Sequence, residues 1–127
     1  MKMFEILELE IILPNLTTKQ LPIRTLYKIN KLFELVEKEK TFYQSHFQEI
    51  VDNCAERDEH GQYIYIDEEC TSIKIIPDKI PECQAKMDEL ANIEITNVPD
   101  IHFTFEELDS LILSYNEARP LMKFIKD

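Results

Sequence analysis

The sequence predicts a single α+β domain in which helices dominate. Three observations lead to this prediction. Apolar residues at heptad spacing run through residues 22–60, with no glycine there and no proline after position 22. Two β-rich stretches, 62–67 and 71–76, are separated by a short acidic turn. Residues 93–127 combine short β-rich stretches with two sequence signals for helix starts.

The N-terminal segment, residues 1–21, is ambiguous between strand and helix. Four apolar residues recur at helical spacing: Ile6, Leu9, Leu13 and Leu16. Residues 5–11 also alternate in part, as a half-buried strand does. Pro14 should end or bend whichever element forms. We expect a short strand near Met3 and then a helix.

Residues 22–60 are predicted to form one long amphipathic helix. Pro22 suits its first turn, and Gly61 follows its end. Apolar residues lie alternately three and four positions apart, with Lys40 as the one break: Leu26, Ile29, Phe33, Val36, Tyr43, Phe47, Ile50 and Cys54. A helix of roughly 34 residues is about 50 Å long, which exceeds the width of so small a domain. Part of it must therefore pack on another helix or another chain.

A small β-hairpin is predicted for residues 61–77 and a shorter, antiparallel return helix for residues 78–92. The return helix repeats the heptad spacing at four positions: Ile80, Cys83, Met87 and Leu90. It is long enough to cover only part of the long helix. Residues 23–40 therefore need the N-terminal helix or another protomer as a cover.

Residues 93–127 are predicted to form a compact C-terminal α/β unit. Short strands are expected at residues 93–96, 101–104 and 111–113. Thr104 and Ser114 each precede a glutamate by three positions, and this capping box predicts a helix start. Pro120 predicts a late start or a kink in the last helix.

The formal charge of −11 comes from 25 acidic and 14 basic side chains. This balance disfavours DNA, RNA and anionic membranes as direct partners, because all three attract basic surfaces. Gly61 is the only glycine, which excludes phosphate-cradling loops and G-x-S-x-G nucleophile elbows. Three cysteines without a C-x-x-C pair favour a reducing compartment. With no signal peptide and no membrane-spanning run, we expect a cytoplasmic protein.

Residues of catalytic or metal-binding type are scattered along the chain. The histidines His46, His60 and His102 have no further ligands at the spacing that a zinc site needs. The spacing does not support a nucleophilic pair of Cys70 with His60. Adjacent carboxylates are expected by chance in a chain with 25 acids. We therefore predict a non-enzymatic protein with no catalytic residues, no cofactor and no metal.

Four stretches resemble a known group of proteins: residues 21–28, which enter the long helix, 56–61, which follow it, 89–95, and 113–125. From about residue 20 onward, the chain resembles a widespread group of short, uncharacterised phage and prophage proteins, mostly from phages of Gram-positive hosts. It departs from their pattern at Pro120 and in the β-rich insert of residues 62–76. The group has no established activity, so no functional residue carries over. The resemblance implies a viral origin and a partner-directed role.

Two hypotheses about function follow. The first is a phage protein of virion assembly, or a minor virion component, which binds a phage or host protein or a second copy of itself. Its binding surface would be the seam of heptad positions Leu26, Ile29, Phe33, Val36, Tyr43 and Phe47. The second is an acidic inhibitor that mimics phosphates in the basic groove of a host nucleic-acid-binding or defence protein. Its acidic face would comprise Asp67, Glu68, Glu69, Asp78, Glu82, Asp88 and Glu89. Either protein would act in the host cytoplasm, and the first also in the virion.

Overall fold

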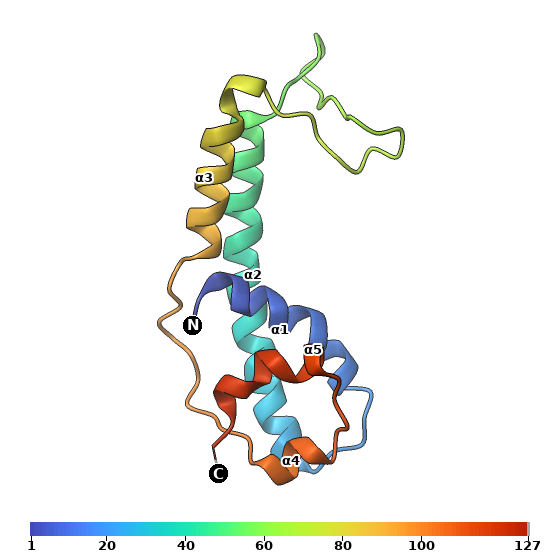
Figure 1. Ribbon diagram of the computed structural model, residues 1–127, viewed down its shortest axis with the longest axis vertical. Coiled ribbons are helices and arrows are strands. Elements are labelled where there is room, and N and C mark those ends of the chain that lie inside the picture. The colour runs from blue at the N-terminus through green and yellow to red at the C-terminus, as the bar shows by residue number, and fades with distance from the viewer. Residues whose placement is uncertain (127) are drawn as a thin grey trace. The chain divides into compact units, whose positions relative to one another are not determined.

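The computed structural model describes residues 1–126, and within them every regular element is a helix (Figure 1). The α-helices are α1 (Met3–Leu16), α2 (Ile23–Cys54), α3 (Ile80–Ala91), α4 (Phe105–Asp109) and α5 (Tyr115–Ala118), and the 3-10 helices are η1 (Pro77–Lys79) and η2 (Arg119–Phe124). The α+β prediction is therefore wrong, and the described chain is all-α. Its contacts divide it into two compact units. Unit 1 comprises Met1–Thr41 and the chain from Glu94 onward, and unit 2 comprises Phe42–Ile93.

Helix α1 replaces the strand that was expected near Met3. The carboxylate of Glu5 accepts the Lys2 backbone N–H at 3.0 Å, which satisfies one amide at the helix start. One face of α1 is fully buried: Met3, Ile6, Leu9, Ile12, Leu13 and Leu16. Pro14 lies in the last turn, where α1 ends two residues later. At the N-terminus only an isolated bridge forms, between Lys2 and Glu94.

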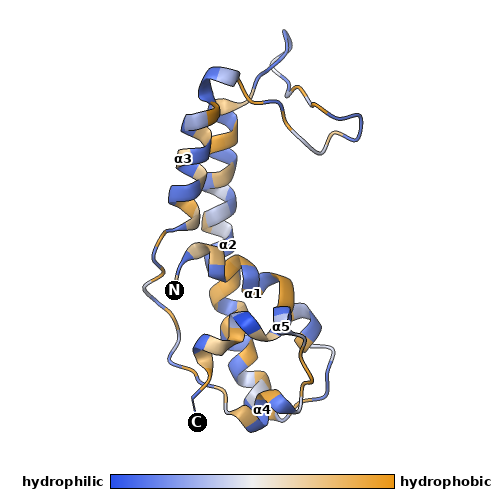
Figure 2. Ribbon diagram, viewed as in Figure 1, coloured by the Kyte–Doolittle hydropathy of each residue, from blue (hydrophilic) through white to orange (hydrophobic). Residues whose placement is uncertain are grey.

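The first part of α2 belongs to the core of unit 1. Its buried face comprises Ile29, Leu32, Leu35 and Val36. Helix α1 crosses this part of α2 (Figure 1), and Lys40 pairs with Glu10 of α1 at 2.9 Å. Phe103, Leu121 and Phe124 are buried in the same unit. The apolar face of residues 23–40 is thus covered by other parts of the same chain, and no second protomer is needed for it. The hydropathy colouring of Figure 2 shows apolar segments of α1 and α2 meeting here.

Helix α2 ends at Cys54, six residues before its predicted end. Its last carbonyl groups are taken by the chain that returns from the loop. The Ile76 N–H donates to the Cys54 carbonyl at 2.9 Å, and the Lys79 ammonium donates to the Asn53 carbonyl at 2.8 Å. These contacts replace the hydrogen bonds that a longer helix would have made. In unit 2, α3 then runs back beside the second half of α2, as the return helix was expected to do (Figure 1).

Residues 61–77 do not form the predicted β-hairpin. The extended segments meet only at isolated bridges, such as Tyr65 with Ile73. Their central feature is a closed ring of three backbone hydrogen bonds. Glu56 donates to Lys74 at 2.9 Å, Lys74 donates to Ile64 at 2.7 Å, and Ile64 donates to Glu56 at 3.2 Å. Each of the three segments thus pairs with both of the others, and each pairing stops at one isolated bridge instead of continuing as a ladder.

The expected C-terminal α/β unit is also absent. In residues 93–126 the extended segments contribute two isolated bridges, Lys2 with Glu94 and Phe103 with Ile125, and no strand. Both capping boxes do start helices: Thr104 accepts the Glu107 N–H before α4, and Ser114 accepts the Glu117 N–H before α5. Pro120 lies in the first turn of η2, where its missing N–H breaks no helical bond.

Candidate protein-docking surfaces

The two predicted binding surfaces are placed very differently by the fold. Of the helical seam, Ile29 and Val36 are core residues of unit 1, whereas Phe33 and Tyr43 are half-buried. Leu26 and Phe47 are exposed, and the Tyr43 and Phe47 rings stack with centroids 5.7 Å apart. The seam is therefore not one continuous exposed stripe.

The acidic face lies entirely in unit 2, but on two separate segments. Asp67, Glu68 and Glu69 lie in the loop that leads away from the helices in Figure 1, whereas Asp78, Glu82, Asp88 and Glu89 lie on η1 and α3. Two of the seven carboxylates make local contacts. The Thr71 hydroxyl and the backbone N–H groups of Thr71 and Ser72 donate to Asp67, and together they lower its pKa. Glu82 pairs with Lys86 at 3.0 Å.

An apolar groove in unit 2 lies between the loop and α3, and we call it the isoleucine groove. It has a volume of about 390 Å³ and is lined by Ile66, Ile73, Lys74, Ile75, Ile80, Cys83 and Gln84. Ile66 is 69% exposed and Ile80 is 44% exposed. The hydrogen-bonded ring fixes one wall through Lys74, whose ammonium also pairs with Glu56 at 3.3 Å. In the sequence, Ile66, Ile73 and Ile75 lie in β-rich stretches and Ile80 is a heptad position of the return helix, and neither pattern indicates a groove.

Unit 2 carries most of the negative charge of the molecule. Residues 42–93 contain twelve acidic and four basic side chains, for a net charge of −8 out of −11. Five acidic side chains of the predicted face make no ion pair in the part of the chain that the structure describes: Glu68, Glu69, Asp78, Asp88 and Glu89. The isoleucine groove thus lies within an acidic unit.

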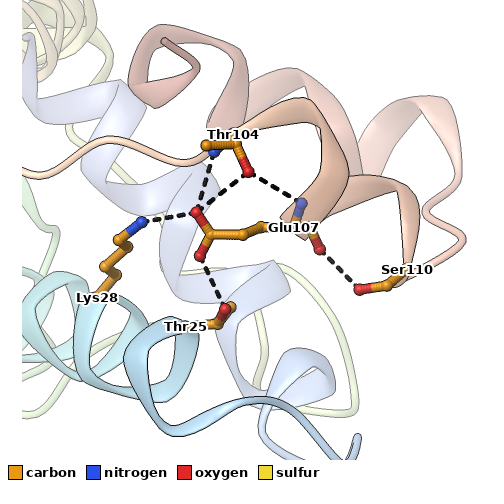
Figure 3. Close-up of polar contacts among 5 residues, drawn as sticks. All are labelled: Thr25, Lys28, Thr104, Glu107 and Ser110. Atoms are coloured by element: carbon orange, nitrogen blue, oxygen red, sulfur yellow. Dashed lines mark hydrogen bonds and ion pairs between the residues drawn. The ribbon is translucent and has the colours of Figure 1, made fainter. Parts of the chain in front are cut away.

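In unit 1, a polar clamp around Glu107 joins α4 to α2 (Figure 3). The Lys28 ammonium and the Thr25 hydroxyl, both on α2, donate to the Glu107 carboxylate at 2.6 and 2.8 Å. The Thr104 N–H donates to it at 3.1 Å. Burial by itself would raise the pKa of Glu107, but the hydrogen bonds from Lys28, Thr25 and Thr104 outweigh it and lower the pKa to about 2. The clamp therefore holds the start of α4 on α2.

The surface beside this clamp is a hollow of about 310 Å³, which we call the C-terminal hollow. It is lined by Phe105, Leu108, Asp109, Ile112, Leu113, Ala118, Met122 and Ile125. Three of these side chains are strongly exposed: Phe105 at 51%, Ile112 at 87% and Met122 at 50%. Ile112 was expected in a strand, yet its φ is +49°. No sequence signal identifies a β-branched residue in this left-handed conformation, which normally favours glycine or asparagine.

The Cys54 and Cys83 thiols are neighbours, whereas the histidines contact other residues. His46 stacks on Phe42 with ring centroids 4.2 Å apart, and His102 lies 3.0 Å from the Asp100 carboxylate. Cys54 is buried, Cys83 half-buried and Cys70 exposed. Among residues 1–126, no group of three or more histidine, cysteine, aspartate or glutamate side chains is placed to hold a metal ion.

No protein-family model, curated protein or solved structure matches the chain. None of the helices in the described residues has both the length and the apolar character needed to cross a membrane. The function is therefore inferred from the surfaces of the two units.

Proposed function

We propose that the chain is a non-enzymatic phage protein that binds another protein, of phage or host, in the host cytoplasm. Its role would be in virion assembly or as a minor virion component. The viral origin rests on the sequence resemblance alone. The binding role is supported by one observation above all, the exposed isoleucine groove in an acidic unit.

The apolar lining of the groove provides the driving force for binding. Fully burying an isoleucine side chain contributes about 1.5–3 kcal/mol, so covering Ile66 and Ile80 contributes about 2–4 kcal/mol after their present partial burial. Such a contact is too small to be a stable interface by itself. A partner therefore needs further contacts beside the groove, in a unit that carries most of the negative charge.

The charge of unit 2 determines what those further contacts are. A partner surface that is apolar in the middle and basic at its edges matches a groove lined by isoleucines in a unit of net charge −8. A basic amphipathic helix has this arrangement, with apolar residues on one face and lysine or arginine beside them. We propose a partner segment of this kind.

Peptide binding tests this proposal directly. The probe is a fluorescent amphipathic helical peptide of leucine and lysine, and its control is the same peptide with glutamate in place of lysine. We expect the lysine peptide to bind at low salt, the glutamate peptide not to bind, and binding to weaken at about 0.5 M salt. The readout is fluorescence anisotropy with the full chain.

Variants then assign the binding to the groove. The double substitution Ile66→Ser with Ile80→Ser should weaken binding about tenfold or more. The matched control is Ile11→Ser with Ile23→Ser, because these isoleucines are 75% and 82% exposed in unit 1. Equal binding by both double variants would overturn the proposal.

An acidic inhibitor remains the second candidate, and the concentration of charge in unit 2 favours it. A phosphate mimic would use carboxylates and would not need the isoleucines. The substitution Glu68→Gln with Glu69→Gln removes two acidic side chains from the loop and leaves the groove lining in place. If this variant loses the lysine peptide while the groove variant keeps it, the inhibitor is the better proposal.

A further inference from the structure

We infer that Cys54 and Cys83 are a redox pair, which a small-molecule disulfide such as oxidised glutathione converts from two thiols into one intramolecular disulfide. Cys54 is the last residue of α2, and Cys83 lies in the first turn of α3. The bond would join these two helices of unit 2. The inference concerns the oxidation chemistry of the chain and does not depend on the function proposed for the isoleucine groove.

The return of the chain to the end of α2 places the two thiols together. The Ile76 N–H donates to the Cys54 carbonyl at 2.9 Å, and the Lys79 ammonium donates to the Asn53 carbonyl at 2.8 Å. Both contacts hold η1, which directly precedes α3, against the last turn of α2. Helix α3 then runs beside α2 (Figure 1), and the Cys83 thiol lies next to that of Cys54.

The two thiols differ in their access to solvent, and this difference gives each one its own role. Cys54 is 1% exposed, so an oxidant in solution does not reach its sulfur. Cys83 is half-buried and lines the isoleucine groove. An oxidant therefore reaches Cys83 from the groove, and the buried Cys54 thiol lies behind it. This arrangement suits an attacking thiol and a resolving thiol.

Thiol–disulfide exchange then proceeds in two steps. The Cys83 thiol loses its proton to water, and its thiolate attacks one sulfur of oxidised glutathione. A mixed disulfide forms, and one glutathione leaves as a thiolate that takes up a proton. The Cys54 thiol next loses its proton, attacks the Cys83 sulfur and displaces the second glutathione. Two protein thiols are thus oxidised to one disulfide, and one glutathione disulfide is reduced to two thiols.

The surroundings of Cys83 make the first step slow. Burial, the neighbouring Cys54 thiol and the Glu82 carboxylate raise the pKa of Cys83, whereas the Lys86 ammonium lowers it. Their sum is a raised pKa, so little of the attacking thiolate is present at neutral pH. The pair should therefore stay as two thiols in a reducing compartment and close only on sustained exposure to an oxidant.

Closure of the pair would act on the isoleucine groove. Cys83 and Ile80 are three residues apart on α3, and both line the groove. A bond from Cys83 to the last residue of α2 would attach this wall of the groove covalently to the neighbouring helix. It would also close a loop over residues 55–82, which contain the acidic segment and the hydrogen-bonded ring.

Oxidation of the full chain by glutathione disulfide at about pH 8 tests the inference. We expect mass spectrometry of the unreduced, digested protein to find the peptides of Cys54 and Cys83 joined to each other. The exposed Cys70, whose thiol contacts the Glu68 carbonyl, should instead carry one glutathione. Because the bond constrains the unfolded chain, it should raise the melting temperature of unit 2 by about 5–15 °C, and dithiothreitol should reverse this shift.

Variants separate the two roles. In Cys54→Ala, Cys83 should keep its glutathione as a stable mixed disulfide, because the resolving thiol is missing. In Cys83→Ala, Cys54 should stay reduced in the folded chain. Cys70→Ser is the matched control and should form the Cys54–Cys83 bond at the unchanged rate. An unchanged chain in which Cys83 stays reduced, keeps its glutathione or pairs with Cys70 would overturn the inference.

Discussion

At the scale of single residues, the most consequential side chain of unit 1 is a carboxylate. Glu107 is part of the capping box of α4, and its carboxylate also accepts hydrogen bonds from Lys28 and Thr25 of α2. The capping box was visible in the sequence, since Thr104 and Glu107 are three residues apart. The other two donors are about 80 positions away along the chain, so only the fold brings them together.

Acid should therefore weaken the contribution of Glu107 to stability. Its folded pKa of about 2 lies below the ordinary value of 4.5, so the stabilisation is full above pH 4.5 and is lost as the pH falls toward 2. The difference corresponds to about 2–3 kcal/mol once screening by solvent is allowed for, because the Glu107 side chain is only partly buried. We expect Glu107→Gln to lower the free energy of unfolding by this amount at pH 6, as measured with denaturant.

The gap between Glu107→Gln and the unchanged protein should close as the pH approaches 2. Glu106→Gln is the matched control, because Glu106 is the exposed neighbour on the same helix. A gap of constant size from pH 6 to pH 2.5 would mean that the carboxylate is not stabilised in the folded state.

The backbone conformation of Ile112 is one that the local sequence pattern does not predict. The run Leu111, Ile112, Leu113 predicts a strand, because branched apolar residues favour extended backbone. In the fold, Leu111 is buried after a short helix, and Ile112 next to it adopts a left-handed conformation. This outcome depends on where α4 ends, and no local pattern specifies it.

At the scale of elements, the amphipathic helices were the predictable part of the fold. The apolar spacing of α2 and α3 found both helices, with boundaries that differ from the structure by a few residues. In α1 the same spacing competes with an alternating pattern, and a helix forms over the whole of Met3–Leu16. A helix satisfies its backbone within itself, so local sequence is enough to indicate it.

The buried face of α1 should carry most of its contribution to stability. Leu9 is completely buried in unit 1, whereas Ile11 on the same helix is 75% exposed. We expect Leu9→Ala to cost about 2–5 kcal/mol, because it leaves a cavity in the core. Ile11→Ala should change the free energy of unfolding by less than about 0.5 kcal/mol. Similar losses from both variants would show that α1 is not packed as described.

The extended segments of unit 2 were harder to predict for a physical reason. Alternating isoleucines and tyrosines in residues 62–67 indicate extended backbone but do not say what the backbone bonds to. Here a third segment, the chain after α2, joins the pairing through Glu56 and closes the ring with Ile64 and Lys74. The ring joins Glu56 to Lys74, which are 18 positions apart, so no local sequence pattern predicts it.

Hydrogen exchange should reveal the ring in solution. We expect the amides of Glu56, Ile64 and Lys74 to be protected and to exchange at similar rates, because their three bonds join the three segments in one ring. The amide of Glu59, which is on the adjoining exposed turn, should exchange quickly. Protection of Ile64 and Lys74 without protection of Glu56 would instead indicate a simple hairpin.

At the scale of the whole molecule, charge is distributed unequally between the two units. Unit 2 has a net charge of −8 and unit 1 the remaining −3. In the sequence, residues 58–127 carry a net charge of −10, and the division into units places most of the negative charge of the molecule in unit 2. The predicted helical seam is not available as one binding surface, because Ile29 and Val36 are buried in the core of unit 1.

The three cysteines of unit 2 differ in exposure, so their reaction rates with a thiol reagent report on the local structure. Cys70 is exposed on the loop, Cys83 lines the isoleucine groove and Cys54 is buried. Burial and the neighbouring Cys54 thiol raise the pKa of Cys83, so its reactive thiolate is scarce at neutral pH. A thiol reagent should modify Cys70 first, Cys83 more slowly, and Cys54 only on unfolding. Mass spectrometry of the labelled chain checks this order.

A ligand in the isoleucine groove should slow labelling of Cys83 while the rate at Cys70 stays constant. The chain thus contains a protected thiol, an open thiol and a ligand-sensitive thiol within a single unit of 52 residues. Occupancy of the groove can therefore be followed in a mixture of proteins without attaching any probe in advance.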